Sequence, residues 1–223
     1  MILWLIFAFI FAALEAVALL KNSRLLEFIA KPAVMVCLFI WLYLNTGLQG
    51  ITLWFGVGIL FSLLGDVLLM LSLERMFVFG LGAFLLAHFF YIVGFQDQFS
   101  SLSAGSLLIV ALLGASGIRL VRRIVGSIRA KGQDKLVVPV IIYSAVISLM
   151  LFSALTTIFD PAWSTSASFF VSVGASFFFL SDIILAWNKF VSPITNGRII
   201  NIALYHLGQI GLIAGIILGV QSL

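Results

Sequence analysis

The chain has 223 residues, of which 63% are hydrophobic and 9% charged, and its mean hydropathy is +1.28. Soluble domains carry about 25% charged residues, so this composition excludes a soluble globular protein and indicates a polytopic membrane protein. The formal net charge is +4, but the basic residues lie between apolar runs. We therefore predict that they set membrane topology and that the chain does not bind nucleic acid. The single cysteine, Cys37, excludes an internal disulfide and a cysteine-based metal site.

The apolar runs predict the architecture. A membrane-spanning helix needs about 20 apolar residues, and this criterion gives one all-α transmembrane domain over residues 1–223. Lys21 and Arg24 follow the first apolar run instead of preceding it, so we predict a retained helix and not a cleaved signal peptide. Pro32 is expected in the first turn of the second span, where its missing N–H costs nothing. The eight predicted spans cover residues 2–20, 32–48, 51–73, 76–96, 104–124, 136–159, 164–188 and 199–220.

The basic residues separate cleanly between the predicted connections. All 12 lysines and arginines lie at the end of, or in the connection after, the first, third, fifth or seventh span, and none follows an even-numbered span. Cytosolic connections of membrane proteins are enriched in these residues, so we predict that both termini lie on the non-cytosolic side. The separation also supports the number of spans, because one helix more or fewer would mix the two sets. We predict an integral protein of a bacterial inner membrane.

Two aspartates lie within apolar helices. Asp66 belongs to SLLGDVLLML (62–71), and Asp182 belongs to FFLSDIILAW (178–187). A carboxylate at membrane depth costs about 2.5–3.5 kcal/mol by insertion scales, so such residues usually have a function. The alternative is structural: each carboxylate could accept hydrogen bonds from serines, or the two could pair across helices. Because both occur in matched contexts, we favour a functional role.

The two halves of the chain resemble each other. His88 follows Asp66 by 22 residues, and His206 follows Asp182 by 24. Each pair comes after a proline-containing span that begins behind a lysine. The pattern indicates a four-helix unit duplicated in parallel orientation, although the identity between the halves is weak. Two unrelated halves are the alternative, and the inverted repeat typical of many transporters is not indicated.

Sequence distance also predicts depth, at about 1.5 Å per helical residue. Asp66 precedes Arg75 by nine residues and Asp182 precedes Lys189 by seven, so both should lie about 10–14 Å inside the cytosolic surface. His88 is expected deeper. The same spacing brings four more polar residues to the layer of the aspartates: Glu15, Tyr143, Tyr205 and His206.

The last span has a polar face that must point away from lipid, formed by Arg198, Asn201, Tyr205 and Gln209 at helical spacing. Structural alternatives remain open here: Glu15 could pair with a nearby lysine, and the tyrosines could be packing residues with a satisfied hydroxyl group. Lys189 and Arg198 serve topology, with phosphate binding as a second use. We take Asp66 and Asp182 as candidate catalytic residues, and as candidate substrate-binding residues Glu15, Lys31, His88, Tyr143, Asn201, Tyr205, His206 and Gln209.

The chemistry of such a site follows from its two acids. Two carboxylates in one low-dielectric pocket do not ionise together easily, so one could act as a general acid while the other activates water. A site in the cytosolic leaflet suits a lipid whose polar headgroup meets the basic residues and whose tail stays in the bilayer. The histidines form no HxxH or HxxxH pair, and no P-loop, GxGxxG or GxSxG motif occurs. We expect neither a metal nor a cofactor.

Several motifs, in this order, resemble those of the YhhN-type integral membrane proteins, whose animal members are lysoplasmalogenases. They are Lys31-Pro32, Gly65-Asp66, GLGAFLLAHFFYIVGF (80–95), the stretch 139–143, GASFFFLSDIILAWNKF (174–190) and YHLGQ (205–209). The resemblance runs over about residues 10–215. It implies eight membrane helices and hydrolysis of the vinyl ether of a lysoplasmalogen to a fatty aldehyde and a glycerophospho-alcohol. The paired membrane aspartates of the family would fall on Asp66 and Asp182.

Two other function classes remain as alternatives. A proton-coupled transporter or lipid flippase would use the aspartates as proton carriers and would form no product. A receptor or structural membrane protein would need a polar core, but it would not need the acidic residues to share one layer. The sequence does not give the headgroup preference or the oligomeric state.

Overall fold

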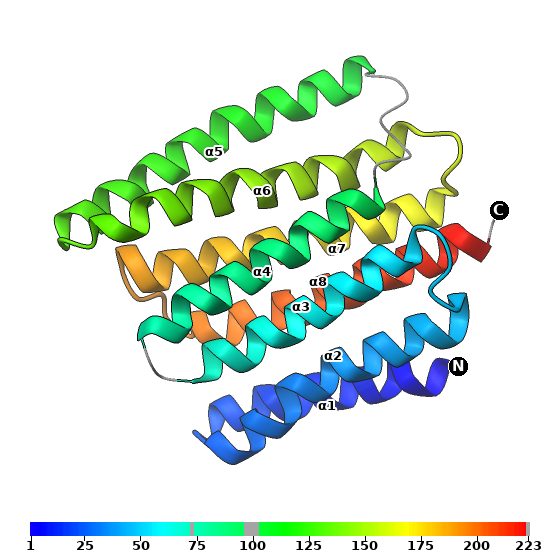
Figure 1. The fold of residues 1–223 in the computed structure, drawn as a ribbon, viewed down its shortest axis with the longest axis horizontal. Coiled ribbons are helices and arrows are strands. Elements are labelled where there is room, and N and C mark those ends of the chain that lie inside the picture. Colours follow the sequence, from blue (N-terminus) through cyan, green and yellow to red (C-terminus); the bar gives the residue numbers. More distant parts are fainter. Residues whose placement is uncertain (72–73, 96–102, 222–223) are drawn as a thin grey trace.

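The computed structural model describes residues 1–71, 74–95 and 103–221 (Figure 1). Within these ranges the chain forms eight helices that are long and apolar enough to cross a membrane, and it forms no strand. The prediction of an all-α protein with eight membrane helices is confirmed. The predicted end of the third helix at Leu73 and the polar connection that follows Gln96 lie outside the described residues.

The helices follow one another with short connections. α6 is extended by a 3-10 turn at each end, and α7 continues into a π turn. In chain order the elements are α1 (Ile2–Leu20), α2 (Arg24–Thr46), α3 (Thr52–Met70), α4 (Glu74–Gly94), α5 (Ala104–Ala130), η2 (Asp134–Leu136), α6 (Val137–Thr156), η3 (Thr157–Phe159), α7 (Thr165–Ala186), η4 (Trp187–Val191) and α8 (Gly197–Gln221).

The second helix begins earlier than predicted. The expectation that Pro32 lies in its first turn is wrong, because α2 starts at Arg24 and Pro32 lies inside it. The apolar-length criterion placed the start after the last charged residue. Two charges are accommodated in the first two turns because each has a partner on another helix, Glu27 with Arg198 and Lys31 with Asp66. The extra length brings Lys31 into the protein interior.

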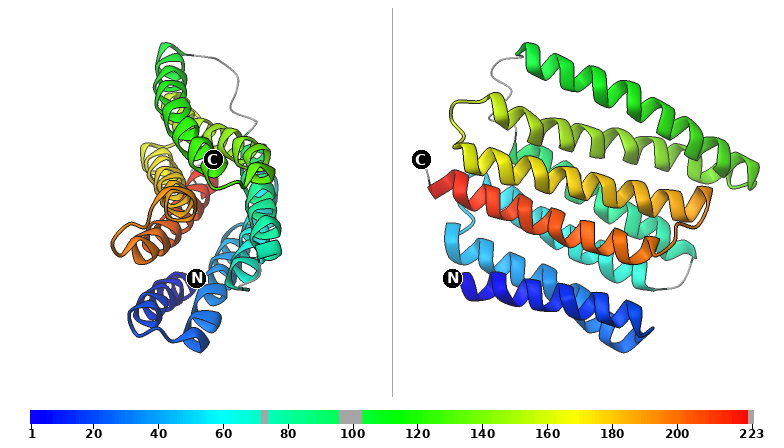
Figure 2. Two further views of the ribbon diagram at one scale, coloured as in Figure 1. Left: turned by 90° about the vertical axis from the view of Figure 1, so that its left-hand side faces the viewer. Right: turned by 180° about the vertical axis from the view of Figure 1, so that it is seen from behind.

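The helices form one bundle, with α1 and α5 at opposite edges (Figures 1 and 2). Helices α7 and α8 lie on one side of the α3–α4 pair. Both termini lie at the same end of the bundle, and the α1–α2 and α5–α6 connections lie at the other (Figure 1). Which end faces the cytosol stays a prediction, and so does the duplication of a four-helix unit.

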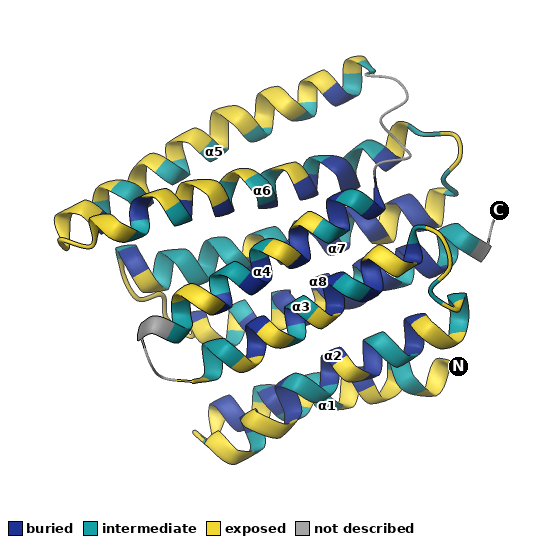
Figure 3. Cartoon of the chain, in the orientation of Figure 1, coloured by how far each residue is buried: buried dark blue, intermediate teal, exposed yellow. Residues whose placement is uncertain are grey.

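Burial differs strongly between the helices. In α8, 67% of the most apolar window is buried, whereas in α5 only 6% is buried. Figure 3 shows this contrast, with α5 mostly exposed. Helix α8 contacts α1, α2 and α7, so it is a central helix of the bundle. Side chains of α8 can therefore meet partners from both halves of the chain.

Glycines allow α7 and α8 to approach closely. A Cβ atom on Gly208 would lie 2.7 Å from the backbone nitrogen of Phe178, and one on Gly174 would lie 2.3 Å from that of Leu212. Real side chains do not tolerate such distances, so only glycine fits. Small residues of this kind let the backbones of membrane helices approach closely. This contact fixes α7, which carries Asp182, against α8, which carries Tyr205.

Candidate active site

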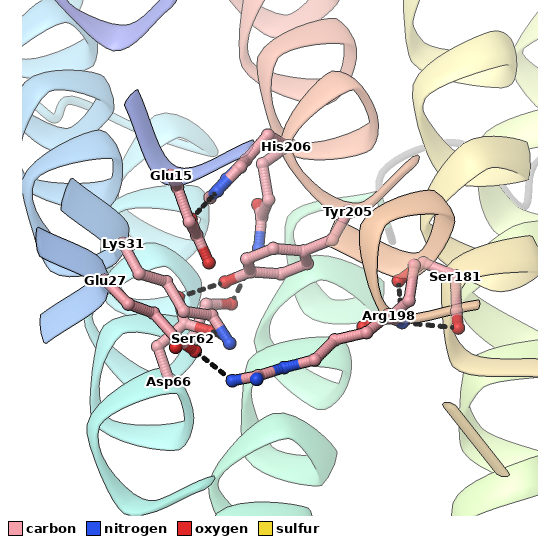
Figure 4. Close-up of polar contacts among 11 residues, drawn as sticks. Glu15, Glu27, Lys31, Ser62, Asp66, Ser181, Arg198, Tyr205 and His206 are labelled. Atoms are coloured by element: carbon pink, nitrogen blue, oxygen red, sulfur yellow. Dashed lines mark hydrogen bonds and ion pairs between the residues drawn. The ribbon is translucent and has the colours of Figure 1, made fainter. Parts of the chain in front are cut away.

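Asp66 is the centre of a fully buried polar cluster. Its Oδ1 lies 3.1 Å from Nζ of Lys31, and the hydroxyl group of Tyr205 donates a hydrogen bond of 2.6 Å to its Oδ2. Lys31 itself is only 7% exposed. Figure 4 shows the three side chains converging from α2, α3 and α8. An ion pair with a hydrogen bond on the second oxygen offsets part of the cost of burying the carboxylate.

Two further ion pairs flank this cluster (Figure 4). Glu15 of α1 contacts Nε2 of His206, and both residues are buried. Glu27 of α2 contacts the guanidinium group of Arg198, which is largely exposed. Glu15 therefore pairs with the histidine of α8, and neither nearby lysine is its hydrogen-bonded or ion-paired partner among the described contacts. Both pairs connect the first two helices to the last one.

Three uncharged side chains next to Asp66 form a chain of hydrogen bonds. The amide nitrogen of Gln209 donates to Ser62 at 2.9 Å, and the hydroxyl group of Tyr91 donates to the amide oxygen of Gln209 at 2.8 Å. All three residues are buried. Ser62 lies one turn before Asp66 on α3, so this chain joins α3, α4 and α8 directly behind the carboxylate.

Asp182 is the centre of a second cluster. Its Oδ2 accepts a hydrogen bond from the hydroxyl group of Tyr143 and lies 3.3 Å from Nε2 of His88. The same histidine nitrogen lies 3.1 Å from the tyrosine oxygen. Tyr143 and His88 are buried, whereas the Asp182 side chain is 11% exposed. Among the described residues, none is bonded to the other carboxylate oxygen, Oδ1, which leaves it available to a ligand.

The prediction that His88 lies deeper than the aspartates is wrong for its side chain, which reaches Asp182. Side chains on a helix lean toward its N-terminus. Helices α4 and α7 run in opposite directions (Figure 1), so the two side chains lean toward each other. A depth estimated by counting residues along the backbone ignores this tilt of the side chains.

Both aspartates line one cavity of about 470 Å³. Its charged walls come from α2, α8 and the turn after α7, because Lys31, Arg198 and Lys189 also face it. Apolar walls are formed by residues such as Leu69, Phe84 and Leu185. A cavity of this size can hold a lipid headgroup together with water. Glu27 lines the cavity as well, so three carboxylates and three cations share one space.

The candidate residues therefore fall into two groups. Lys31, Asn201 and Tyr205 line the cavity beside the aspartates. The other five do not line it, and each supports a neighbour through the contacts described above: Glu15, His88, Tyr143, His206 and Gln209. Asn201 is held in place because its amide nitrogen donates to the carbonyl and hydroxyl oxygens of Ser181 at 2.8 and 2.9 Å.

Sequence reasoning missed Glu27 and Tyr91. Glu27 precedes Lys31 by one helical turn, a spacing that would have placed it on the same face had the second helix been extended backwards. Tyr91 follows His88 by three residues in a long aromatic stretch, and nothing in that stretch distinguishes it from packing residues. In the part of the chain that the structure describes, no three His, Cys, Asp or Glu side chains are arranged to hold a metal ion.

Comparison with known proteins gives consistent matches. The model of the YhhN family matches residues 26–216. Human lysoplasmalogenase TMEM86B is 27% identical over 179 residues, covering 80% of this chain and 69% of the human protein. Human lysoplasmalogenase TMEM86A is 31% identical over 157 residues, covering 69% of this chain and 60% of that protein. Mouse lysoplasmalogenase TMEM86B is 28% identical over 184 residues, covering 82% of this chain and 71% of the mouse protein. No solved structure matches the chain significantly.

Proposed function

The chain belongs to the YhhN family, whose model covers residues 26–216, and from this premise we propose that it hydrolyses the vinyl ether bond of a lysoplasmalogen. The products are a fatty aldehyde and a glycerophospho-alcohol. The names of the human and mouse relatives support this reaction. The observation that carries the proposal is that Asp66 and Asp182, from distant parts of the sequence, line the same cavity.

We assign the general acid to Asp182. A vinyl ether is cleaved by protonating its β-carbon, which gives an oxocarbenium ion. The Oδ2 atom of Asp182 is held by Tyr143 and His88, so a proton on Oδ1 points to a ligand and not to the protein. Asp182 also borders an apolar pocket. General acid catalysis of this kind contributes about 10²- to 10⁴-fold to the rate.

Asp66 then acts as the base. The Lys31 ammonium group lies 3.1 Å from its Oδ1 and favours the carboxylate form by charge attraction, and Tyr205 fixes its second oxygen. The carboxylate takes a proton from the water that adds to the oxocarbenium ion, and the resulting hemiacetal collapses to the aldehyde and the free alcohol. The negative charge also stabilises the cationic intermediate. Solvent in the cavity returns the proton to Asp182.

Basic residues at the mouth of the cavity suit the phosphate of the headgroup. Lys189 and Arg198 line the cavity together with the carboxylates, and Arg198 is 67% exposed on its side chain. Guanidinium and ammonium groups are the side chains that bind phosphate best. Within this proposal the site opens to the cytosolic leaflet, as the distribution of basic residues predicts, and the membrane is a bacterial inner membrane.

The test is a product assay in detergent. Purified protein is incubated with an alkenyl lysophosphatidylethanolamine, and free aldehyde is trapped as a hydrazone and quantified. We expect aldehyde release by the wild-type chain and a rate lower by about 10²- to 10⁴-fold with Asp182→Asn. The transporter or flippase alternative is not favoured, because the named relatives are enzymes. It would require that no aldehyde forms in detergent, where no gradient exists, so the absence of product would overturn the proposal.

A further inference from the structure

A groove on the outside of the bundle runs between α5 and α6. It encloses about 560 Å³, and its walls are residues of these two helices, among them Val110, Gly114 and Leu149. Both helices are membrane-spanning by length and composition, so the groove faces the acyl chains of the bilayer. Lipid hydrocarbon therefore has direct access to it.

This groove continues inward to Asp182. A narrow apolar pocket of about 60 Å³ lies between α4, α5, α6 and α7. It shares four wall residues with the groove: Gly117, Val121, Ser144 and Ser148. Its inner walls include Tyr143 and Asp182. Since Asp182 also lines the polar cavity, the spaces follow one another from lipid to the carboxylate and on to the basic residues.

The walls of the passage are mainly apolar, although Arg122 and two serines also line it. The hydroxyl group of Ser144 donates to the carbonyl oxygen of Val140 at 2.8 Å, and that of Ser148 donates to the carbonyl oxygen of Ser144 at 2.7 Å. Both hydroxyl groups thus bond to their own helix and offer little to a polar ligand. A hydrocarbon chain meets methyl groups, methylene groups and aromatic rings along most of the passage.

Helix α5 is packed at its ends and open in the middle. Ser106 is buried near its start, and Ile124 and Ile128 are buried near its end. Between Ser106 and Ile124 no residue of α5 is buried. A Cβ atom added to Gly114 or Gly117 would meet no atom within 4 Å. The open part of the helix therefore coincides with the groove, and these glycines leave room that a larger side chain would fill.

We propose that the α5–α6 groove and the pocket behind it form a lateral entrance for the single hydrocarbon chain of the lipid substrate. This inference rests on the proposed function. The chain lies in the groove and pocket, the vinyl ether lies at Asp182, and the phosphate lies among Lys189, Arg198 and Lys31. Because the inner pocket is narrow, it admits one unbranched chain, and this favours a lysolipid over a phospholipid with two chains.

Gly117→Leu tests the entrance, with Gly126→Leu as its matched control. Both glycines lie on α5, and an added Cβ has open space at each, but Gly126 lines neither the groove nor the pocket. Leucine is also a better helix former than glycine, so both variants should fold. We expect Gly117→Leu to lower kcat/KM at least tenfold for a hexadecenyl lysolipid and to leave a butenyl analogue unchanged. Gly126→Leu should change neither. Equal losses on both substrates would overturn the proposal.

A binding experiment separates this inference from the proposed reaction. An alkyl lysophosphatidylethanolamine with a diazirine near the end of its chain cannot be hydrolysed, and it can be photo-crosslinked to the protein and mapped by mass spectrometry. We expect crosslinks within residues 110–121 and 141–152, lost in Gly117→Leu and kept in Gly126→Leu. If the protein releases no aldehyde but crosslinks there, the reaction is wrong and the entrance stands. Crosslinks spread over the other helices, or unchanged in Gly117→Leu, would overturn the entrance.

Discussion

The two aspartate centres draw their partners from corresponding helices, but the chemical nature of those partners differs. Asp66 is fully buried and pairs with the Lys31 ammonium group. Asp182 is partly exposed, and its partners are a tyrosine hydroxyl group and a histidine ring. A lysine ammonium group favours the ionised form of the carboxylate beside it, whereas Asp182 has no lysine or arginine partner among the described contacts. In the proposed mechanism this difference gives each acid a separate task in one cavity.

The likeness between the centres is in where their partners come from. Each aspartate contacts one side chain from the helix before it, Lys31 for Asp66 and Tyr143 for Asp182. Each also contacts one side chain from the last helix of the other half, Tyr205 or His88. Neither centre is complete within its own half of the chain. The two halves must therefore pack together before either site exists.

The largest expected effect is that of Asp182→Asn. An asparagine keeps the shape of the side chain and can still accept a hydrogen bond from Tyr143, but it has no proton to donate to carbon. We expect kcat to fall by about 10²- to 10⁴-fold, as for loss of a general acid, with little change in the melting temperature. Initial rates of aldehyde release and thermal unfolding in detergent check this. A variant with near-normal turnover would remove Asp182 from the mechanism.

Asp66→Asn should lose activity and stability together. The substitution leaves the Lys31 ammonium group buried without its counter-ion, and removing one partner of a buried ion pair costs about 3–5 kcal/mol. The double variant with Lys31→Met removes both charges, so it should recover most of the stability and none of the activity. Thermal unfolding and aldehyde release are measured on all three proteins. If Asp66→Asn were as stable as wild type, the ion pair would not be the feature that distinguishes the two centres.

Tyr143→Phe and Tyr205→Phe compare the supports of the two acids. Each variant removes one hydrogen bond to a carboxyl oxygen, worth about 0.5–1.5 kcal/mol for a neutral acceptor and about 1.5–3 kcal/mol for a charged one. We expect kcat to fall about tenfold in each, since about 1.4 kcal/mol corresponds to a factor of ten. A larger effect on KM than on kcat would mean that the tyrosines bind substrate and do not position the acids.

Arg198→Gln should have the smallest effect. Its pair with Glu27 is largely exposed on the arginine side, and such pairs contribute about 0–1 kcal/mol to stability. We expect a KM a few-fold higher and an unchanged kcat, because the residue contacts the headgroup and not the vinyl ether. Steady-state kinetics at two salt concentrations check this, since added salt should reduce the difference. A fall in kcat with unchanged KM would contradict the assignment.

Hydropathy and the positions of the charges predicted the eight helices because both can be read from consecutive residues, without knowing which helices are neighbours. The two aspartates were also visible, since a carboxylate in an apolar helix is conspicuous. The partners of the aspartates depend on which helices lie next to each other in the bundle, and no local sequence pattern gives this information. Glu27 and the buried position of Lys31 were missed because the second helix was started at Pro32, after charges that find partners on α3 and α8. Depth counting likewise missed the approach of His88 to Asp182, which arises from side chains leaning between antiparallel helices.

Hydrolysis in D₂O tests the central claim most directly. If Asp182 protonates the β-carbon of the vinyl ether, its proton has exchanged with solvent, and the aldehyde should carry one deuterium at carbon 2. The product is trapped at once as a hydrazone and analysed by mass spectrometry, with the synthetic aldehyde incubated in parallel to measure background exchange. Aldehyde with one deuterium above this background is the predicted result. Aldehyde without deuterium at carbon 2 would contradict the account.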